Sequence, residues 1–170
     1  MRIMGIDPGL AHTGYGVIEF TGSESRMLVM GEIVTRADAA LALRLQEIHD
    51  RLHAVIEAWQ PEAVAVESLF FCTNVRTAIA VAQARGVALL ATATANVPLF
   101  EYTPLEIKLA VSGYGKATKE QMQKMVRAIL GLREEPRTSH AADALAAALC
   151  HAHSQRFQQF VEWSQSSRRR

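Results

Sequence analysis

The first third of the chain carries short blocks of apolar residues separated by turn residues, a pattern typical of β-strands. Three blocks, at residues 2–6, 13–20 and 27–34, follow one another with a glycine in each intervening turn. They predict an antiparallel three-stranded meander. Between residues 41 and 59 the apolar positions recur every three or four residues instead, so this segment is predicted to be a helix with one face on the sheet.

Two further strand patterns follow this helix. Residues 63–67 are apolar and short, and they predict a strand that runs parallel to residues 2–6, because a helix connects the two. Residues 74–95 are rich in alanine and apolar on more than one side, which predicts a helix that must be covered on more than one side. Residues 97–102 predict the fifth strand.

The last third of the chain is predicted to be helical. Capping-box sequences place helix starts at Thr103 and Thr118, and a third helix is expected to begin near Ser139. Together the elements predict an α/β fold with a central mixed five-stranded sheet, made of an antiparallel meander plus parallel strands and flanked by helices. We expect one domain over residues 1–153 and a C-terminal extension over residues 154–170 whose polar end is disordered.

Two of the predicted parallel strands end in an acid. Asp7 follows the first strand and precedes Pro-Gly, and Glu67 closes the strand at residues 63–67. Ligands of α/β sheets bind at the carboxyl ends of parallel strands, so the two carboxylates are expected to share one site. Asp143 and His140 lie three residues apart at the start of the last helix, where they share a face.

Carboxylates that converge repel one another unless a cation lies between them. Asp7, Glu67 and Asp143, with or without an imidazole, fit Mg²⁺ or Mn²⁺, and two such ions are suited to phosphodiester cleavage. Each acid also has a plainer interpretation as a turn, a cap or a surface charge. That interpretation is weakest for Glu67, since apolar residues flank it on both sides.

Composition narrows the class of protein. The 170 residues are 49% hydrophobic and carry a net charge of +1, with two cysteines far apart in sequence. We therefore expect a cytoplasmic protein with reduced thiols, and no membrane association, since no apolar run looks long enough to cross a bilayer. Basic residues outnumber acidic ones in residues 68–137, nine to five, which is compatible with a polyanionic partner.

A small-residue stripe follows the helix at residues 74–95. Ala78, Ala82 and Gly86 recur at steps of four and permit another helix to approach closely. Either a second copy of the chain covers this face, forming a homodimer, or a helix of the same chain does, such as the one ending near Leu130.

Several of these segments resemble one known family in order and spacing. They are Ile-Asp-Pro-Gly at residues 6–9 with Thr-Gly-Tyr-Gly at 13–16, Ala-Val-Glu at 65–67, Gln-Ala-Arg-Gly at 83–86 and Ala-Ala-Asp-Ala-Leu-Ala at 141–146. Over residues 1–153 the chain resembles the RuvC family of Holliday-junction resolvases. The resemblance implies an RNase H-like fold, a homodimer, Mg²⁺-dependent paired nicking of four-way DNA junctions in strands of like polarity, and a branch-migration motor as partner.

The resemblance also implies roles for single residues. Asp7, Glu67 and Asp143 match the family's metal-binding acids, while His140 stands where many members carry a further Asp. His140 is therefore a metal ligand, a residue that positions or activates water, or only a helix-capping residue. DNA-contacting residues are expected as well: Phe70 as the family's junction-probing aromatic, Lys108 and Lys119 near the scissile phosphate, and Arg76 as a general phosphate contact.

Three other functions remain open at this stage. A glycine-flanked Asp in a hairpin also begins sugar-kinase and actin-type ATPase folds, but those need a second, similar domain for which this chain is too short. A nuclease of the same fold that acts on RNA and a junction-binding protein without cleavage activity are the other two.

Overall fold

A computed structural model describes residues 1–68 and 75–167, with side chains described at residues 1–68 and 77–155. Its centre is a five-stranded sheet in the order β3-β2-β1-β4-β5. The first three strands form an antiparallel meander, and β4 and β5 continue it in parallel with β1. The strand bounds are β1 Arg2–Asp7, β2 His12–Phe20, β3 Ser25–Val34, β4 Ala63–Glu67 and β5 Leu99–Tyr102.

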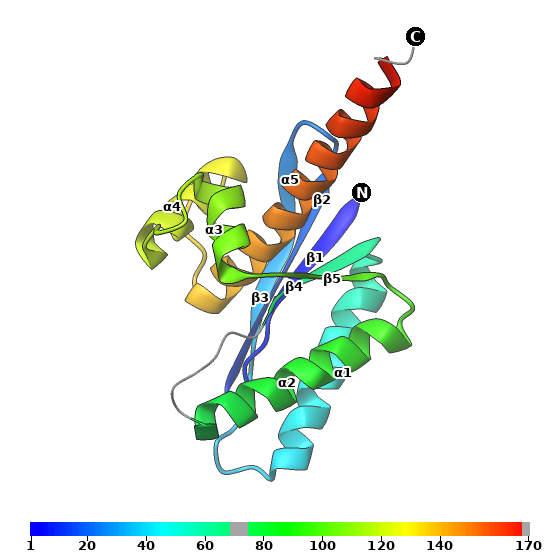
Figure 1. The fold of residues 1–170 in the computed structure, drawn as a ribbon. Helices are drawn as coiled ribbons and strands as arrows, with labels where there is room; N and C mark the ends of the chain where they lie inside the picture. Colours follow the sequence, from blue (N-terminus) through cyan, green and yellow to red (C-terminus); the bar gives the residue numbers. More distant parts are fainter. Residues whose placement is uncertain (69–74, 168–170) are drawn as a thin grey trace.

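Helices cover both faces of this sheet (Figure 1). On one face α1 packs on α2, and on the other α5 lies across β1 and β2 with α3 and α4 beside it. Each face has its own apolar core, so every central strand is buried on both sides. The helix bounds are α1 Leu41–Trp59, α2 Val75–Thr94, α3 Pro104–Ser112, α4 Lys119–Ile129 and α5 Ser139–Ser167.

Two glycines allow α5 to lie directly on the sheet. A Cβ at Gly5 in β1 would overlap the carbonyl of Ala144, and one at Gly14 in β2 would overlap the carbonyl of His140. The missing side chains therefore let the α5 backbone approach β1 and β2 more closely than any other residue would permit. This contact fixes the first turn of α5 above the end of β1.

The sequence patterns predicted this architecture well. The mixed five-stranded sheet, the neighbouring parallel pair β1 and β4, and the capping boxes at Thr103 and Thr118 are all confirmed. The helix at residues 74–95 is confirmed as α2, and α1 packs on one side of it, whereas the helix ending near Leu130 packs on α5 and α3.

The C-terminal end differs from expectation. We predicted disorder at residues 164–170 from their polarity, whereas the α5 backbone stays helical to Ser167. Once a helix has begun, each added residue gains a backbone hydrogen bond, so polar residues can prolong it into solvent. Residues 168–170 lie outside the described part of the chain, and the division at residue 153 stays a prediction.

A segment of α2 contradicts the expectation that no apolar run is long enough to cross a bilayer. Thr77–Thr94 has a mean hydropathy of 1.3 and is long and apolar enough to span a membrane by length and composition alone. We expected no such segment, because its alanines and threonines are individually only weakly apolar. Only 22% of its residues are buried within this chain, and Ile79, Ala82, Gly86 and Leu90 are exposed.

Candidate active site

The candidate site lies where β1 and β4 end. Asp7 is the last residue of β1 and Glu67 the last of β4, and the register pairs Ile6 with Val66 just before them. Parallel neighbours in register present successive side chains at the same edge of the sheet. The two carboxylates therefore lie side by side, as the two strand ends predicted.

The first turn of α5 adds two more groups. Nδ1 of His140 lies 2.7 Å from Oδ2 of Asp7, and this hydrogen bond joins residues 133 positions apart in sequence. Asp143, one turn further along α5, forms an ion pair of 3.0 Å with Nζ of Lys119, the first residue of α4. Two strands, β1 and β4, and two helices, α4 and α5, thus bring charged or polar side chains together around Asp7.

A cleft of about 260 Å³ opens beside these groups. Two carboxylates and two lysines are among the residues that line it. Its lining residues are Glu67, Pro104, Ile107, Lys108, Lys119, Met122, Asp143 and Ala146. The cleft therefore combines acids that can hold cations with ammonium groups that attract an anionic substrate.

Burial and mutual repulsion raise the pKa of two of the acids, Glu67 and Asp7. Burial raises the pKa of Glu67 to about 7, and the charges of Asp7 and Asp143 add to this increase, while Lys108 and Lys119 oppose it. Burial is also the main reason that the pKa of Asp7 is raised, and its hydrogen bond with His140 partly offsets this. Carboxylates in this condition gain from a nearby cation, because a positive charge stabilises their ionised form.

The hydrogen bond with Asp7 determines which ring nitrogen of neutral His140 carries the hydrogen. An ionised carboxylate only accepts hydrogen bonds, so opposite ionised Asp7 the Nδ1 atom of His140 carries a hydrogen. Neutral His140 then keeps a lone pair on Nε2. That nitrogen can bind a cation or accept a proton from water.

The predicted basic residues fall into different places. Lys108 on α3 and Lys119 line the cleft, and their contact with a scissile phosphate stays a prediction. Arg127 on α4 donates hydrogen bonds to the carbonyls of Leu132 and Arg133, just past the end of that helix. Phe70 lies outside the described residues, and Arg76 lies in α2 with its side chain outside the described part.

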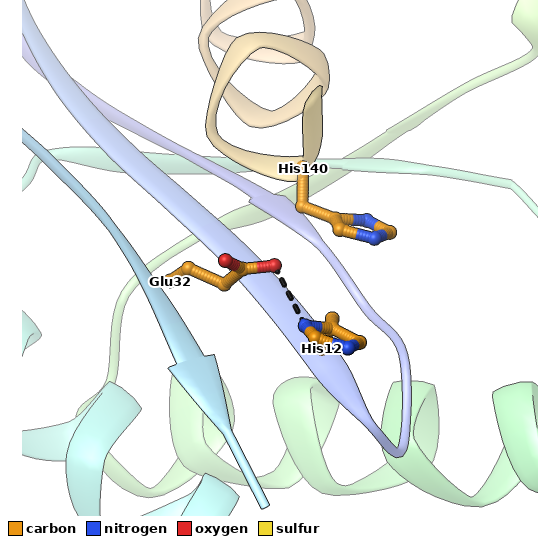
Figure 2. Close-up of side chains that lie close together, drawn as sticks. All are labelled: His12, Glu32 and His140. Atoms are coloured by element: carbon orange, nitrogen blue, oxygen red, sulfur yellow. Dashed lines mark hydrogen bonds and ion pairs between the residues drawn. The ribbon is translucent and has the colours of Figure 1, made fainter. Parts of the chain in front are cut away.

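Sequence reasoning missed two polar residues near His140. His12, the first residue of β2, forms a 2.9 Å contact through Nδ1 with Oε1 of Glu32 on β3, and its ring stacks on that of His140 (Figure 2). Gly14 is paired with Asp7 on β1 and with Glu32 on β3. Glu32 therefore lies in the same cross-strand row as Asp7. No local sequence pattern carries that register, although the spacing of His12 and Gly14 puts them on one face of β2.

Comparison with known proteins agrees with this geometry. The profile described as "Crossover junction endodeoxyribonuclease RuvC" matches residues 3–151. The chain belongs to the RuvC family of crossover junction endodeoxyribonucleases. The RuvC of Syntrophomonas wolfei is 49% identical over 164 residues, which cover 96% of this chain and 95% of the relative.

Solved RuvC structures share the fold. The structure of Thermus thermophilus RuvC superposes with a TM-score of 0.86 at 42% identity, covering 93% of this chain and 97% of that one. T. thermophilus RuvC in complex with a Holliday junction substrate gives a TM-score of 0.85 at 40% identity, covering 92% of this chain and 96% of that one. The RNase H-like fold expected from the sequence is thereby confirmed.

Proposed function

We propose that this chain resolves four-way DNA junctions by metal-dependent hydrolysis of phosphodiester bonds, with paired nicks in strands of like polarity. The observation that carries the proposal is the convergence of Asp7, Glu67 and Asp143 beside a cleft lined by two lysines. Membership in the RuvC family supports DNA junctions over RNA as the substrate. It also supports cleavage over binding alone.

The donor set fits hard divalent cations. Three carboxylates offer the oxygen ligands that Mg²⁺ prefers, and the pKa values of two of them, Asp7 and Glu67, are raised by burial and by repulsion from neighbouring acids. We assign Asp7, Glu67 and Asp143 to hold two Mg²⁺ ions, with His140 as a further ligand through Nε2 and Mn²⁺ as an alternative ion. When bound, these ions lower the pKa of the attacking water and neutralise charge on the scissile phosphate.

The remaining groups orient the reaction. The hydrogen bond between Asp7 and Nδ1 fixes the orientation of the His140 ring. Nε2 is then available to bind a cation or to accept a proton from water. Lys119 begins paired with Asp143, and its side chain is 56% exposed. If Asp143 binds a cation, the ammonium group of Lys119 would be free to contact a phosphate oxygen. Lys108 lines the same cleft.

We assign the open face of α2 to a homodimer. Ile79, Ala82, Gly86 and Leu90 are exposed and follow one another at helical spacing, while Ala84 and Ala88 face the core. Arg85 lies between the exposed stripe and the buried side of the helix, and its guanidinium group pairs with Glu101 of β5 at 2.5 Å. Among the α2 side chains that the structure describes, a stripe of small and apolar residues, with the charge of Arg85 paired to β5, suits an isologous helix contact better than a lipid environment.

The family resemblance supplies the other partners. We propose that Phe70 stacks on an unpaired junction base and that Arg76 contacts a phosphate, both in the segment that leads from β4 into α2. A branch-migration motor is the proposed protein partner, and the cytoplasm is the proposed location.

Substrate choice tests the proposal. Purified protein with Mg²⁺ is incubated with end-labelled four-way junction, linear duplex of the same sequence, and hairpin RNA. We expect symmetric nicks in the junction alone. Preferential cleavage of the RNA would make this chain an RNA nuclease, and junction binding without cleavage in either Mg²⁺ or Mn²⁺ would make it a binding protein.

A further inference from the structure

A second group of metal-ligating side chains lies next to the cleft, on the β3 side of Asp7. His12, Glu32 and His140 each offer one ligand atom, and these atoms all lie within 4.8 Å of one another. They come from β2, β3 and α5, and Figure 2 shows the two rings and the carboxylate gathered over one end of the sheet. Neither His12 nor Glu32 lines the cleft that holds Glu67 and Asp143.

The contacts of the two imidazoles place one nitrogen of each ring for a shared metal. Nδ1 of His12 lies 2.9 Å from Oε1 of Glu32, a separation close to that of two ligand atoms on one small cation. Nδ1 of His140 contacts Oδ2 of Asp7 at 2.7 Å, which leaves Nε2 of that ring for the metal. A histidine that binds a metal through one nitrogen typically has a carboxylate on the other, which fixes the ring and its tautomer.

The sheet register explains why Glu32 reaches this place. Glu32 is paired with Gly14, which in turn is paired with Asp7, so the three residues form one row across β3, β2 and β1. Gly14 has no side chain to fill the middle of the row, and the start of α5 occupies that space. The Glu32 side chain, only 15% exposed, is thereby directed toward His12 and His140.

We propose that His12, Glu32 and His140 bind a transition-metal dication such as Zn²⁺, in a site that adjoins the carboxylate centre that Mg²⁺ would occupy and shares His140 with it. Two imidazoles and one carboxylate are the ligand set that Zn²⁺ and Co²⁺ accept with water in the fourth position, whereas Mg²⁺ prefers oxygen alone. Bond lengths near 2.0–2.2 Å place tetrahedral ligand atoms roughly 3–3.5 Å apart. His12 has a side chain 49% exposed, so a small rotation of its ring closes the remaining distance.

The test is direct metal binding without DNA. Co²⁺ is titrated into the metal-free protein, and its visible d–d absorption reports nitrogen ligation and low coordination number. His49 and His53 on α1 stack at 5.9 Å and form a rival site, so every protein in the series carries His53→Gln. His12→Asn and Glu32→Gln each remove one ligand, and thermal melts establish that each variant is folded.

We expect each of these two variants to weaken Co²⁺ binding at least tenfold, because loss of an outer partner alone costs about 10–100-fold. The matched controls Glu67→Gln and Asp143→Asn should leave the absorption and affinity unchanged. Zn²⁺ should displace the Co²⁺ stoichiometrically, and Mg²⁺ in large excess should not. The proposal is overturned if the His53→Gln parent shows no d–d band, if His12→Asn and Glu32→Gln bind as the parent does, or if binding is lost with Glu67→Gln instead.

Discussion

Glu67 has the most strongly perturbed pKa among the acids of the cleft. Its pKa of about 7 lies well above the ordinary value of 4.5, chiefly because the carboxyl is buried and secondarily because Asp7 and Asp143 repel its charge. In an unfolded chain this carboxyl would ionise near its ordinary value. Between the two pKa values the folded protein therefore binds the proton that the unfolded chain has released.

The metal-free protein should consequently lose stability as pH rises. The group stabilises the fold below about pH 4.5 and this contribution disappears as pH passes through about 7. We expect the melting temperature in EDTA to fall between pH 5 and pH 8, and Glu67→Gln to flatten that fall. Added Mg²⁺ should raise the wild-type melting temperature most at pH 8. Identical pH profiles for wild type and Glu67→Gln would contradict the assignment.

The imidazole at position 140 should tune metal preference. Nitrogen ligands favour Mn²⁺ over Mg²⁺ more than carboxylates do. His140→Asp introduces an oxygen ligand beside Asp7. It should raise the nicking rate in Mg²⁺ relative to the rate in Mn²⁺. An unchanged ratio would argue against ligation and leave His140 with its Nδ1 contact to Asp7 as a positioning role.

Two lysines of α4 offer a matched comparison. Lys119 pairs with Asp143 in the cleft, whereas Lys124 is exposed away from it and lines a different hollow with Arg127. Lys119→Ala should lower the cleavage rate by about 10²-fold or more with little change in junction affinity, as expected for a transition-state contact. Lys124→Ala should leave unchanged the rate at which bound junction is cleaved. Equal losses of affinity in both variants would make Lys119 an ordinary backbone contact.

At the scale of elements, the packing of α5 on β1 and β2 positions the site. Gly14 lies under the carbonyl of His140, and a methyl group there would have to displace the helix backbone. Gly14→Ala should therefore destabilise the protein by about 1–3 kcal/mol in urea unfolding and reduce nicking by moving His140 and Asp143. An unchanged unfolding midpoint would contradict the close approach.

The sequence predicted elements better than it predicted contacts between them. Asp7 and Glu67 could be brought together because each ends a short apolar strand and parallel strands share an edge. Pairings that depend on register could not be predicted, since nothing local aligns Glu32 with Asp7 across Gly14.

At the scale of the molecule, α2 determines whether two sites act together. Ala82 is exposed on the stripe that we assign to the dimer, and Ala58 is exposed on α1 outside that stripe. Ala82→Arg should give a folded monomer with unpaired, slower nicks, because it places two charges at a two-fold contact. Ala58→Arg is the matched control and should stay dimeric in sedimentation. A monomeric wild type at micromolar concentration would rule out the assignment.

The central claim is that Asp7, Glu67 and Asp143 form a metal-dependent centre for junction cleavage, and Asp7→Asn tests it most directly. The substitution keeps the shape of the side chain and removes one ligand charge. Cleavage and binding of a four-way junction are measured for wild type and variant in Mg²⁺, with melting curves to verify folding. The account predicts unchanged binding and folding with nicking reduced below detection, and near-normal nicking by Asp7→Asn would contradict it.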